Sequence, residues 1–187
     1  MRRALAAALA CLALAGCTKH DGKPRIDGVE TFGDLGHTHV PWPVTYPQTP
    51  PVGGDHSDAW LNCGVYTEAV PNVNAVHSME HGAVWITYRP DLPRADVDTL
   101  HRLQGLKPAY VLISPYPGLP GPVVASAWGL QLTVDRADDA RLAEFVRAYA
   151  GGGQGGEPGK PCSGGLDPAQ ARRYDEQRAS ATPSPAS

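Results

Sequence analysis

Two histidines and a glutamate lie within five residues of one another in the segment VHSMEHGAVWITY (76–88). His77, Glu80 and His81 match H-x-x-E-H, the pattern of inverted zinc proteases. In a helix, this spacing places both imidazoles on one face as zinc ligands and makes Glu80 the general base. In an extended chain, His77, Met79 and His81 share one face instead, and a thioether beside two imidazoles suits copper. The local secondary structure therefore decides which chemistry the pattern supports.

The residues around the pattern favour an extended chain. Gly82 follows His81 directly, the strand-like AVWITY (83–88) comes next, and Pro71 with two asparagines stands before the pattern. At most one helical turn fits between these signals. We therefore expect a strand or a turn at 77–81.

A protease would also need a further carboxylate ligand on a later helix. Glu144 is the available candidate, in the segment 137–150 that we expect to be helical. We favour a metal carrier over a protease, with Glu80 orienting an imidazole N–H or acting as an occasional ligand.

Five of the seven histidines fall between residues 37 and 81. His37 and His39 form an H-x-H pair, whose side chains point the same way in an extended chain. His56 follows two glycines in PPVGGDH, which allow backbone conformations that can present it inward. The predicted metal ligands are His37, His39, His56, His77, Met79, Glu80 and His81. We favour copper over zinc, because the set holds a thioether and few carboxylates.

The first 17 residues, MRRALAAALACLALAGC, predict export and lipidation. Two arginines precede a short apolar run, which is typical of a signal peptide and too short for a comfortable membrane span. The final LAGC is similar to a bacterial lipobox. We expect residues 1–16 to be removed and Cys17 to carry the lipid (a palmitate-type anchor), which would hold the protein at the extracytoplasmic face of the cell membrane.

Two of the four cysteines remain for the mature domain, since Cys11 lies in the leader and Cys17 is lipidated. Cys63 and Cys162 are expected to form a disulfide, because an even pair in an oxidising compartment usually does. The alternative is that both are thiolate metal ligands.

The charge balance argues against a nucleic-acid partner. Loss of Arg2 and Arg3 with the leader leaves 14 basic and 19 acidic side chains, and no basic cluster is present. Phosphate contacts need a concentrated basic face.

The mature chain divides into three parts. Residues 17–30 are polar and read as a tether, residues 31–165 as one globular domain, and residues 166–187 as a short surface helix with a disordered tail. The domain opens with a long loop region rich in proline and glycine, which only tertiary contacts, ligands or the disulfide can order. GGGQGGEPGKP (151–161) is expected to be a flexible linker.

The second half of the domain is more regular. Strands are predicted at 83–88 and 109–114, with a longer strand or hairpin arm at 123–134. Apolar residues at helical spacing predict helices at 93–105 and 137–150. We expect an α+β domain with a mostly antiparallel sheet and two packed helices.

The segments YPQTPPVGGDHSDAWLNCGVY and VHSMEHGAVWITYRP resemble the bacterial domain-of-unknown-function family 3105, over roughly residues 30–162. Val52 and Gly53 stand where the family's loop has Thr-Ser, and Met79 stands where many relatives have leucine. The resemblance implies one shared site and no activity. The shared residues that it implies are His56, Gly64, Tyr66, His77, Glu80, His81 and Gly82.

Three functions remain open. The favoured one is a lipid-anchored protein that binds copper or zinc for carriage, buffering or sensing. The second is a zinc-dependent hydrolase with Glu80 as its base, which requires a helix through 77–81. The third is a non-catalytic module that binds another envelope protein, with the histidines satisfied by hydrogen bonds.

Overall fold

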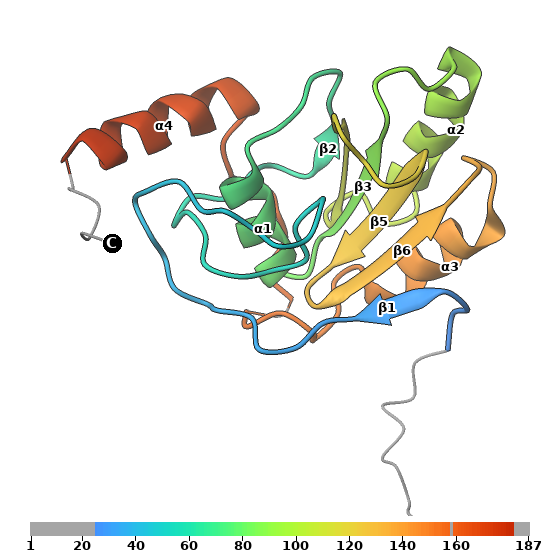
Figure 1. The fold of residues 1–187 in the computed structure, drawn as a ribbon, viewed down its shortest axis with the longest axis horizontal. Helices are drawn as coiled ribbons and strands as arrows, with labels where there is room; N and C mark the ends of the chain where they lie inside the picture. The colour runs from blue at the N-terminus through green and yellow to red at the C-terminus, as the bar shows by residue number, and fades with distance from the viewer. Residues whose placement is uncertain (1–24, 158, 182–187) are drawn as a thin grey trace, which may run out of the picture.

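The computed structural model describes residues 25–157 and 159–181, which form a six-stranded sheet and four helices (Figure 1). The strands are β1 (Val29–Thr31), β2 (Gly64–Val65), β3 (Val84–Tyr88), β4 (Val111–Pro115), β5 (Val123–Ala127) and β6 (Leu130–Val134). The helices are α1 (Asn72–Glu80), α2 (Arg94–Gln104), α3 (Ala140–Tyr149) and α4 (Pro168–Ala181).

The sheet is mixed, with the strand order β1-β6-β5-β3-β4-β2. β1, β6, β5 and β3 pair antiparallel in succession, whereas β4 runs parallel to both β3 and β2. α2 connects β3 to β4, as the crossover that a parallel pair requires. The predicted α+β class with a mostly antiparallel sheet is confirmed.

The two faces of the sheet bury different side chains. Val84 and Ile86 of β3 pack with Leu100 of α2 and Phe145 of α3. Trp85, which lies between them, points to the other face and packs with α1 and α4. In Figure 1, α2 and α3 lie to one side of the sheet, and α1 with its surrounding loops lies to the other. His77, which lies in α1, and His81, its C-cap, are therefore on the α1 side of the sheet.

The amphipathic elements lie where their apolar spacing predicts them. α2 begins directly after Pro93 and ends before Gly105. α3 lies within the expected helix, and its N-cap Asp139 accepts a hydrogen bond from the backbone N–H of Arg141. The segment 123–134 forms the β5–β6 hairpin.

The expected strand or turn at 77–81 is wrong, because α1 is helical to Glu80 and has His81 as its C-cap. Every residue from Asn74 to Glu80 is buried, so this helix lacks the polar face that gives an amphipathic period. Gly82 has a φ of 101°, which favours glycine just after a helix. Gly82 therefore marks the end of α1 and is not evidence against a helix at 77–81.

Tertiary contacts stabilise this short helix. Ser78 Oγ donates to the carbonyl of Leu61 at 2.9 Å and accepts from the Leu61 N–H at 3.1 Å. Asn74 Nδ2 donates to the carbonyl of Ala59 at 2.8 Å. Isolated helices shorter than about 12 residues are marginal in water. α1 therefore depends on the adjoining loop, and its sequence alone does not specify it.

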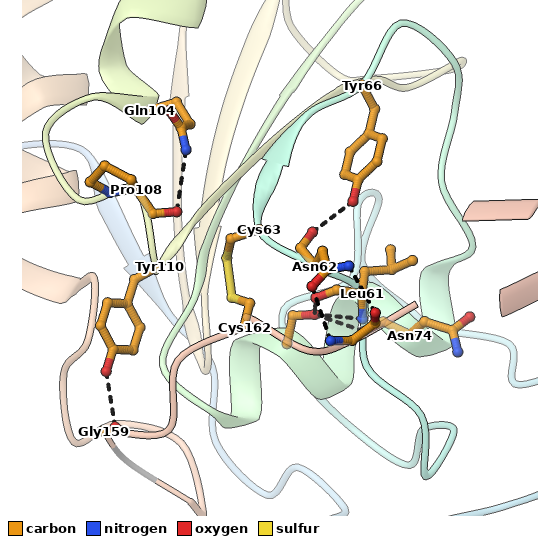
Figure 2. The surroundings of a disulfide bond; sticks show 12 residues. Leu61, Asn62, Cys63, Tyr66, Asn74, Gln104, Pro108, Tyr110, Gly159 and Cys162 are labelled. Atoms are coloured by element: carbon orange, nitrogen blue, oxygen red, sulfur yellow. Dashed lines mark hydrogen bonds between the residues drawn. A yellow bond between two sulfur atoms is a disulfide. The ribbon is translucent and has the colours of Figure 1, made fainter. Parts of the chain in front are cut away.

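Cys63 and Cys162 form the predicted disulfide, shown in Figure 2, across a sequence separation of 99 residues. Close to it, Leu61 and Leu166 form an isolated parallel bridge. The disulfide and the bridge attach the C-terminal segment to the loop that supports α1.

Both ends of the described chain are more ordered than expected. β1 begins at Val29 and Ile26 is buried, within the segment expected to be a tether. α4 buries Ala171 against the α1 side of the sheet, so it is not only a surface helix. The predicted leader, Cys17 and the tail from residue 182 lie outside the described residues.

Among residues 25–157 and 159–181, no helix combines the length and apolar character that crossing a bilayer requires.

Candidate metal centre

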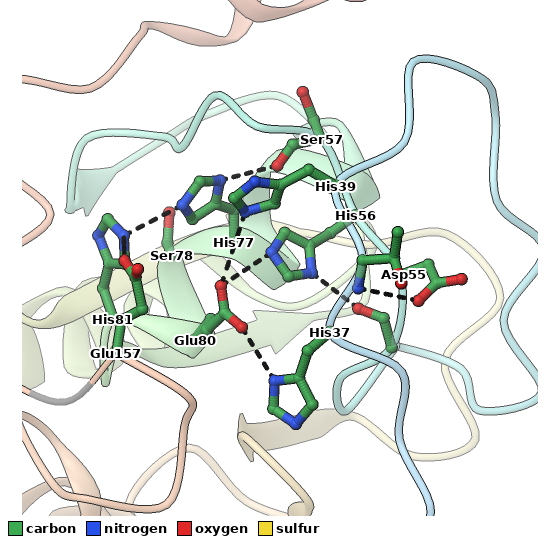
Figure 3. Close-up of polar contacts among 12 residues, drawn as sticks. His37, His39, Asp55, His56, Ser57, His77, Ser78, Glu80, His81 and Glu157 are labelled. Carbon is green, nitrogen blue, oxygen red and sulfur yellow. Dashed lines mark hydrogen bonds and ion pairs between the residues drawn. The ribbon is translucent and has the colours of Figure 1, made fainter.

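α1 brings three candidate donors to one region, as Figure 3 shows. His77 and His81 are four residues apart, and their Nε2 atoms lie 3.0 Å from each other. Glu80 lies nearly one turn after His77. Met79 is two residues from each histidine, on the opposite side of the helix, and is fully buried in the core with Trp85. The prediction that Met79 shares the histidines' face is therefore wrong, because it assumed an extended chain.

The Pro- and Gly-rich loops supply two more imidazoles. The N–H of Val40 donates to the carbonyl of His56, and the N–H of His56 donates to the carbonyl of Thr38, which makes His39 and His56 a parallel bridge. The ring centroids of His39, His56 and His77 lie 4.9 to 5.0 Å from one another. The structure thus brings together histidines that are 38 residues apart in the sequence.

His56 and His77 are each held by a hydrogen bond to a backbone carbonyl. Nδ1 of His56 donates to Gly54 at 2.8 Å, and Nδ1 of His77 donates to Ser57 at 2.7 Å. A carbonyl can only accept, so each Nδ1 carries the proton. Metal-binding histidines show this arrangement, because it leaves the Nε2 lone pair for the ion.

Glu80 is the acidic centre of the cluster, with a side chain that is 6 % exposed. Its Oε2 lies 3.0 Å from Nε2 of His56 and 3.8 Å from Nε2 of His39. Its Oε1 lies 2.9 Å from Nδ1 of His37. Burial raises the pKa of the Glu80 carboxyl, but the hydrogen bond from His37 and the electrostatic influence of the neighbouring imidazoles outweigh burial and lower it. Glu80 is therefore ionised at neutral pH.

His39, His56, His77 and Glu80 form a first group, defined by ligand atoms that all lie within 4.8 Å of one another. Such a group has the donor types and spacing that can hold a metal ion. His37 lies beside the group rather than in it: it contacts Glu80 and stacks on Trp128 with ring centroids 4.5 Å apart. A cavity of about 570 Å³ opens next to His37 and Trp128.

His77, His81 and Glu157 form a second group by the same criterion. Nε2 of His81 lies 3.2 Å from Oε2 of Glu157. Glu144, the carboxylate expected to accompany the H-x-x-E-H pattern, is exposed on α3 and belongs to neither group. Glu157 was not among the predicted ligands, because it lies 76 residues after His81 within a glycine-rich run that carries no helical or strand period.

The glycine-rich run at 151–161 packs onto α1 through its residues 155–157, so the expectation of a flexible linker is wrong there. A Cβ on Gly155 would lie 2.1 Å from the carbonyl oxygen of Glu80. A Cβ on Gly156 would lie 2.9 Å from Oε1 of Glu80. Gly155 and Gly156 thus allow the chain to pack closely against Glu80, and this packing places Glu157 beside His81.

Gly155→Ala is expected to destabilise the fold by about 1–3 kcal/mol, because the added methyl group would overlap backbone atoms that cannot rotate away. Chemical denaturation of the metal-free protein measures the loss. Gly33→Ala is the matched control, since nothing lies within 4 Å of a Cβ there. Equal stability of the two variants would show that the loop does not pack on α1.

Ser57, whose carbonyl anchors His77, is itself held by α4. Ser57 Oγ donates to Oδ1 of Asp175 at 2.7 Å. Asp175 is half-buried, and this burial raises the pKa of its carboxyl. α4 therefore helps to hold Ser57, whose backbone carbonyl orients His77. The sequence does not indicate this contact, because Ser57 and Asp175 are 118 residues apart.

The environment of His77 suppresses its protonation. Burial lowers its pKa from 6.5 to about 4, and the nearby His56 adds to this effect. The side chain is therefore neutral at pH 7, which is the form that binds metals.

The stability of the metal-free protein is expected to fall as the pH drops from 6.5 to 4. In this window the unfolded chain protonates His77 and the folded chain does not, so acid favours the unfolded state. The contribution of His77 is about 3 kcal/mol, at about 1.4 kcal/mol for each pH unit. Urea denaturation between pH 4 and pH 8 should give a shallower slope for His77→Gln than for the wild type. Parallel slopes would contradict the lowered pKa.

The model of a family described as "Protein of unknown function (DUF3105)" matches residues 37–164, a range that contains both donor groups. No curated protein and no solved structure matches the chain.

Proposed function

The chain belongs to the DUF3105 family, and because that family is defined without an activity, we propose a function from the geometry of the site: the protein binds a divalent transition-metal ion. The first group, His39, His56, His77 and Glu80, would be the main position.

One observation carries this proposal. Two buried imidazoles, those of His56 and His77, donate their Nδ1 protons to backbone carbonyls, and Nε2 of His56 lies 3.0 Å from the ionised, buried carboxylate of Glu80, with Nε2 of His77 in the same donor group. Nε2 of His56 and Oε2 of Glu80 both bear lone pairs at 3.0 Å, so a cation between them stabilises the pair. In a non-catalytic module, an additional proton on His56 would have to play this part. Metal binding distinguishes the two cases.

We propose zinc before copper. Copper was favoured because of Met79 and because the set held few carboxylates, but Met79 lies in the core and the two groups include the carboxylates of Glu80 and Glu157. Three imidazoles with one carboxylate are a donor set that zinc accepts. Copper remains the other ion to test.

The proposed location is the extracytoplasmic face of the cell membrane, with Cys17 lipidated and residues 1–16 removed. The leader-like N-terminal sequence supports this location. The Cys63–Cys162 disulfide also supports it, because disulfides persist in oxidising compartments. The role there would be carriage, buffering or sensing of the ion, with an envelope protein as partner.

Direct titration of the metal-stripped protein with Zn(II), Cu(II) and Cu(I) tests the proposal. We expect one tightly bound Zn(II) per chain in the wild type and a loss of affinity in His56→Gln. Absence of binding for all three ions would refute metal binding and favour the interaction module.

A zinc-dependent hydrolase is the second candidate, and a specific observation favours it. α1 supplies the helix that the H-x-x-E-H pattern requires, and Glu157 supplies a carboxylate beside His81. The cavity beside His37 gives a substrate access close to Glu80. The zinc-loaded protein should then cleave unstructured peptides, and Glu80→Gln should lose this activity while Glu144→Gln keeps it. No cleavage by the zinc-loaded wild type would remove this candidate.

A further inference from the structure

We infer that His77, His81 and Glu157 form a second metal position that overlaps the first, so that one ion can pass between the two without leaving His77. This inference rests on the proposed metal-binding function and adds a path for the ion within the site.

The spacing of the second group fits a metal ion. The Nε2 atoms of His77 and His81 are 3.0 Å apart, and Nε2 of His81 is 3.2 Å from Oε2 of Glu157. Ligands about 2.1 Å from a tetrahedral zinc ion are separated by about 3.4 Å. Only small side-chain adjustments are needed to admit an ion.

A single proton is shared among the three side chains of the second group. The proton of His77 is on Nδ1, bound to Ser57, so its Nε2 can only accept. The ionised Glu157 carboxylate also only accepts. Within the group, the single proton on Nε2 of His81 faces both neighbours, and Lys160 Nζ is a further donor to Oε2 of Glu157. A cation at this point would instead serve all three atoms.

Nδ1 of His81 is buried and is not engaged in a hydrogen bond within the described residues. When an ion replaces the Nε2 hydrogen bonds to His77 and Glu157, the His81 proton can therefore occupy Nδ1 without displacing another group, and the Nε2 lone pair becomes available to the ion. The ring packs against Trp60, with centroids 5.1 Å apart, so it is held in place while this happens.

His77 has one nitrogen that is not bonded to Ser57, namely Nε2, and this nitrogen belongs to both groups. An ion held by His39, His56 and Glu80 must give up these ligands to gain His81 and Glu157, but it can keep His77 throughout. Each position also has one ligand open to solvent, since the side chains of His39 and Glu157 are 44 % and 40 % exposed. The ion can therefore enter by one position and leave by the other.

Glu157 also pairs with Lys160 at 2.6 Å. The Lys160 side chain is 58 % exposed, and exposed pairs of this kind contribute little stability. An arriving ion can therefore displace the ammonium group from the carboxylate.

Cobalt(II), whose absorption reports its ligands, tests the inference in the full chain. Affinity and spectrum are compared for wild type, Glu80→Gln, Glu157→Gln and the double variant. We expect Glu80→Gln to keep binding with an altered spectrum, because the ion moves to the second position. Adding Glu157→Gln to that variant should weaken binding by about tenfold or more, since losing even an outer-sphere partner of a ligand costs about 10–100-fold.

Lys160→Ala is the matched control, because it breaks the same ion pair and leaves the carboxylate donor in place. It should not weaken cobalt binding in the Glu80→Gln background. The inference is overturned if Glu157→Gln changes neither affinity nor spectrum in either background while the wild type binds cobalt. If the wild type binds none of cobalt, zinc and copper, the proposed function itself has failed.

Discussion

Replacing His77 with alanine is expected to abolish stabilisation of the protein by metal ions. His77 contributes to both donor groups, so no position keeps its ligand set without it. A metal that binds only the folded state should stabilise the wild type by about 2.7 kcal/mol at a hundredfold excess over Kd. The variant should show no such gain with Zn(II), Cu(II) or Cu(I). Chemical denaturation with and without each ion measures the difference.

The same substitution should also weaken the metal-free fold. It empties a buried volume beside Trp60 and leaves the Ser57 carbonyl without its donor. An unsatisfied buried acceptor costs about 1–3 kcal/mol. This loss is separate from the metal effect, because it appears before any ion is added.

Two controls separate a lost ligand from a damaged fold. His101→Ala removes a histidine on α2, which belongs to neither donor group, and should keep the full metal-dependent gain. Glu80→Gln removes a donor and keeps the shape of the side chain. Retention of the metal-dependent gain in His77→Ala would show that the ions bind elsewhere.

α2 and α1 illustrate which parts of a fold the sequence specifies. α2 has one buried face and one exposed face, so its apolar spacing and its flanking Pro93 and Gly105 define it. α1 is buried on all sides over its last two turns, and its stability comes from hydrogen bonds with the loop that contains Leu61. These contacts involve residues that are distant in the sequence, whereas the residues next to 77–81 predicted a strand or a turn.

The candidate site divides in the same way. Residue type and the H-x-x-E-H and H-x-H spacings were enough to select His39, His56, His77, Glu80 and His81, which the structure brings into two adjoining groups. Met79 was wrongly grouped with the histidines because the segment was expected to be extended, whereas it is helical. Glu157 was missed because its place depends on chain closure around a distant disulfide and on glycines that permit close packing. Neither the closure of the chain by the disulfide nor the close packing at these glycines can be recognised from neighbouring residues in the sequence.

Removing the disulfide, in the double variant Cys63→Ser with Cys162→Ser, is expected to cost about 4–5 kcal/mol of stability, since it closes a loop of about 100 residues in the unfolded chain. The sequence separation of the two cysteines is 99 residues. Denaturation of metal-free wild type with and without a thiol reductant should reproduce the difference. The reductant should not affect the double variant.

The disulfide should matter more to one donor group than to the other. Glu157 lies five residues before Cys162, whereas His39, His56, His77 and Glu80 are held by bridges and backbone hydrogen bonds around α1. The double variant, where it is folded, should therefore bind cobalt in the first position and lose the contribution of Glu157. Adding Glu157→Gln to it should then have no further effect on affinity. A further loss of affinity would mean that the glycine contacts with Glu80 hold Glu157 in place without the disulfide, and that close packing rather than chain closure completes the second position.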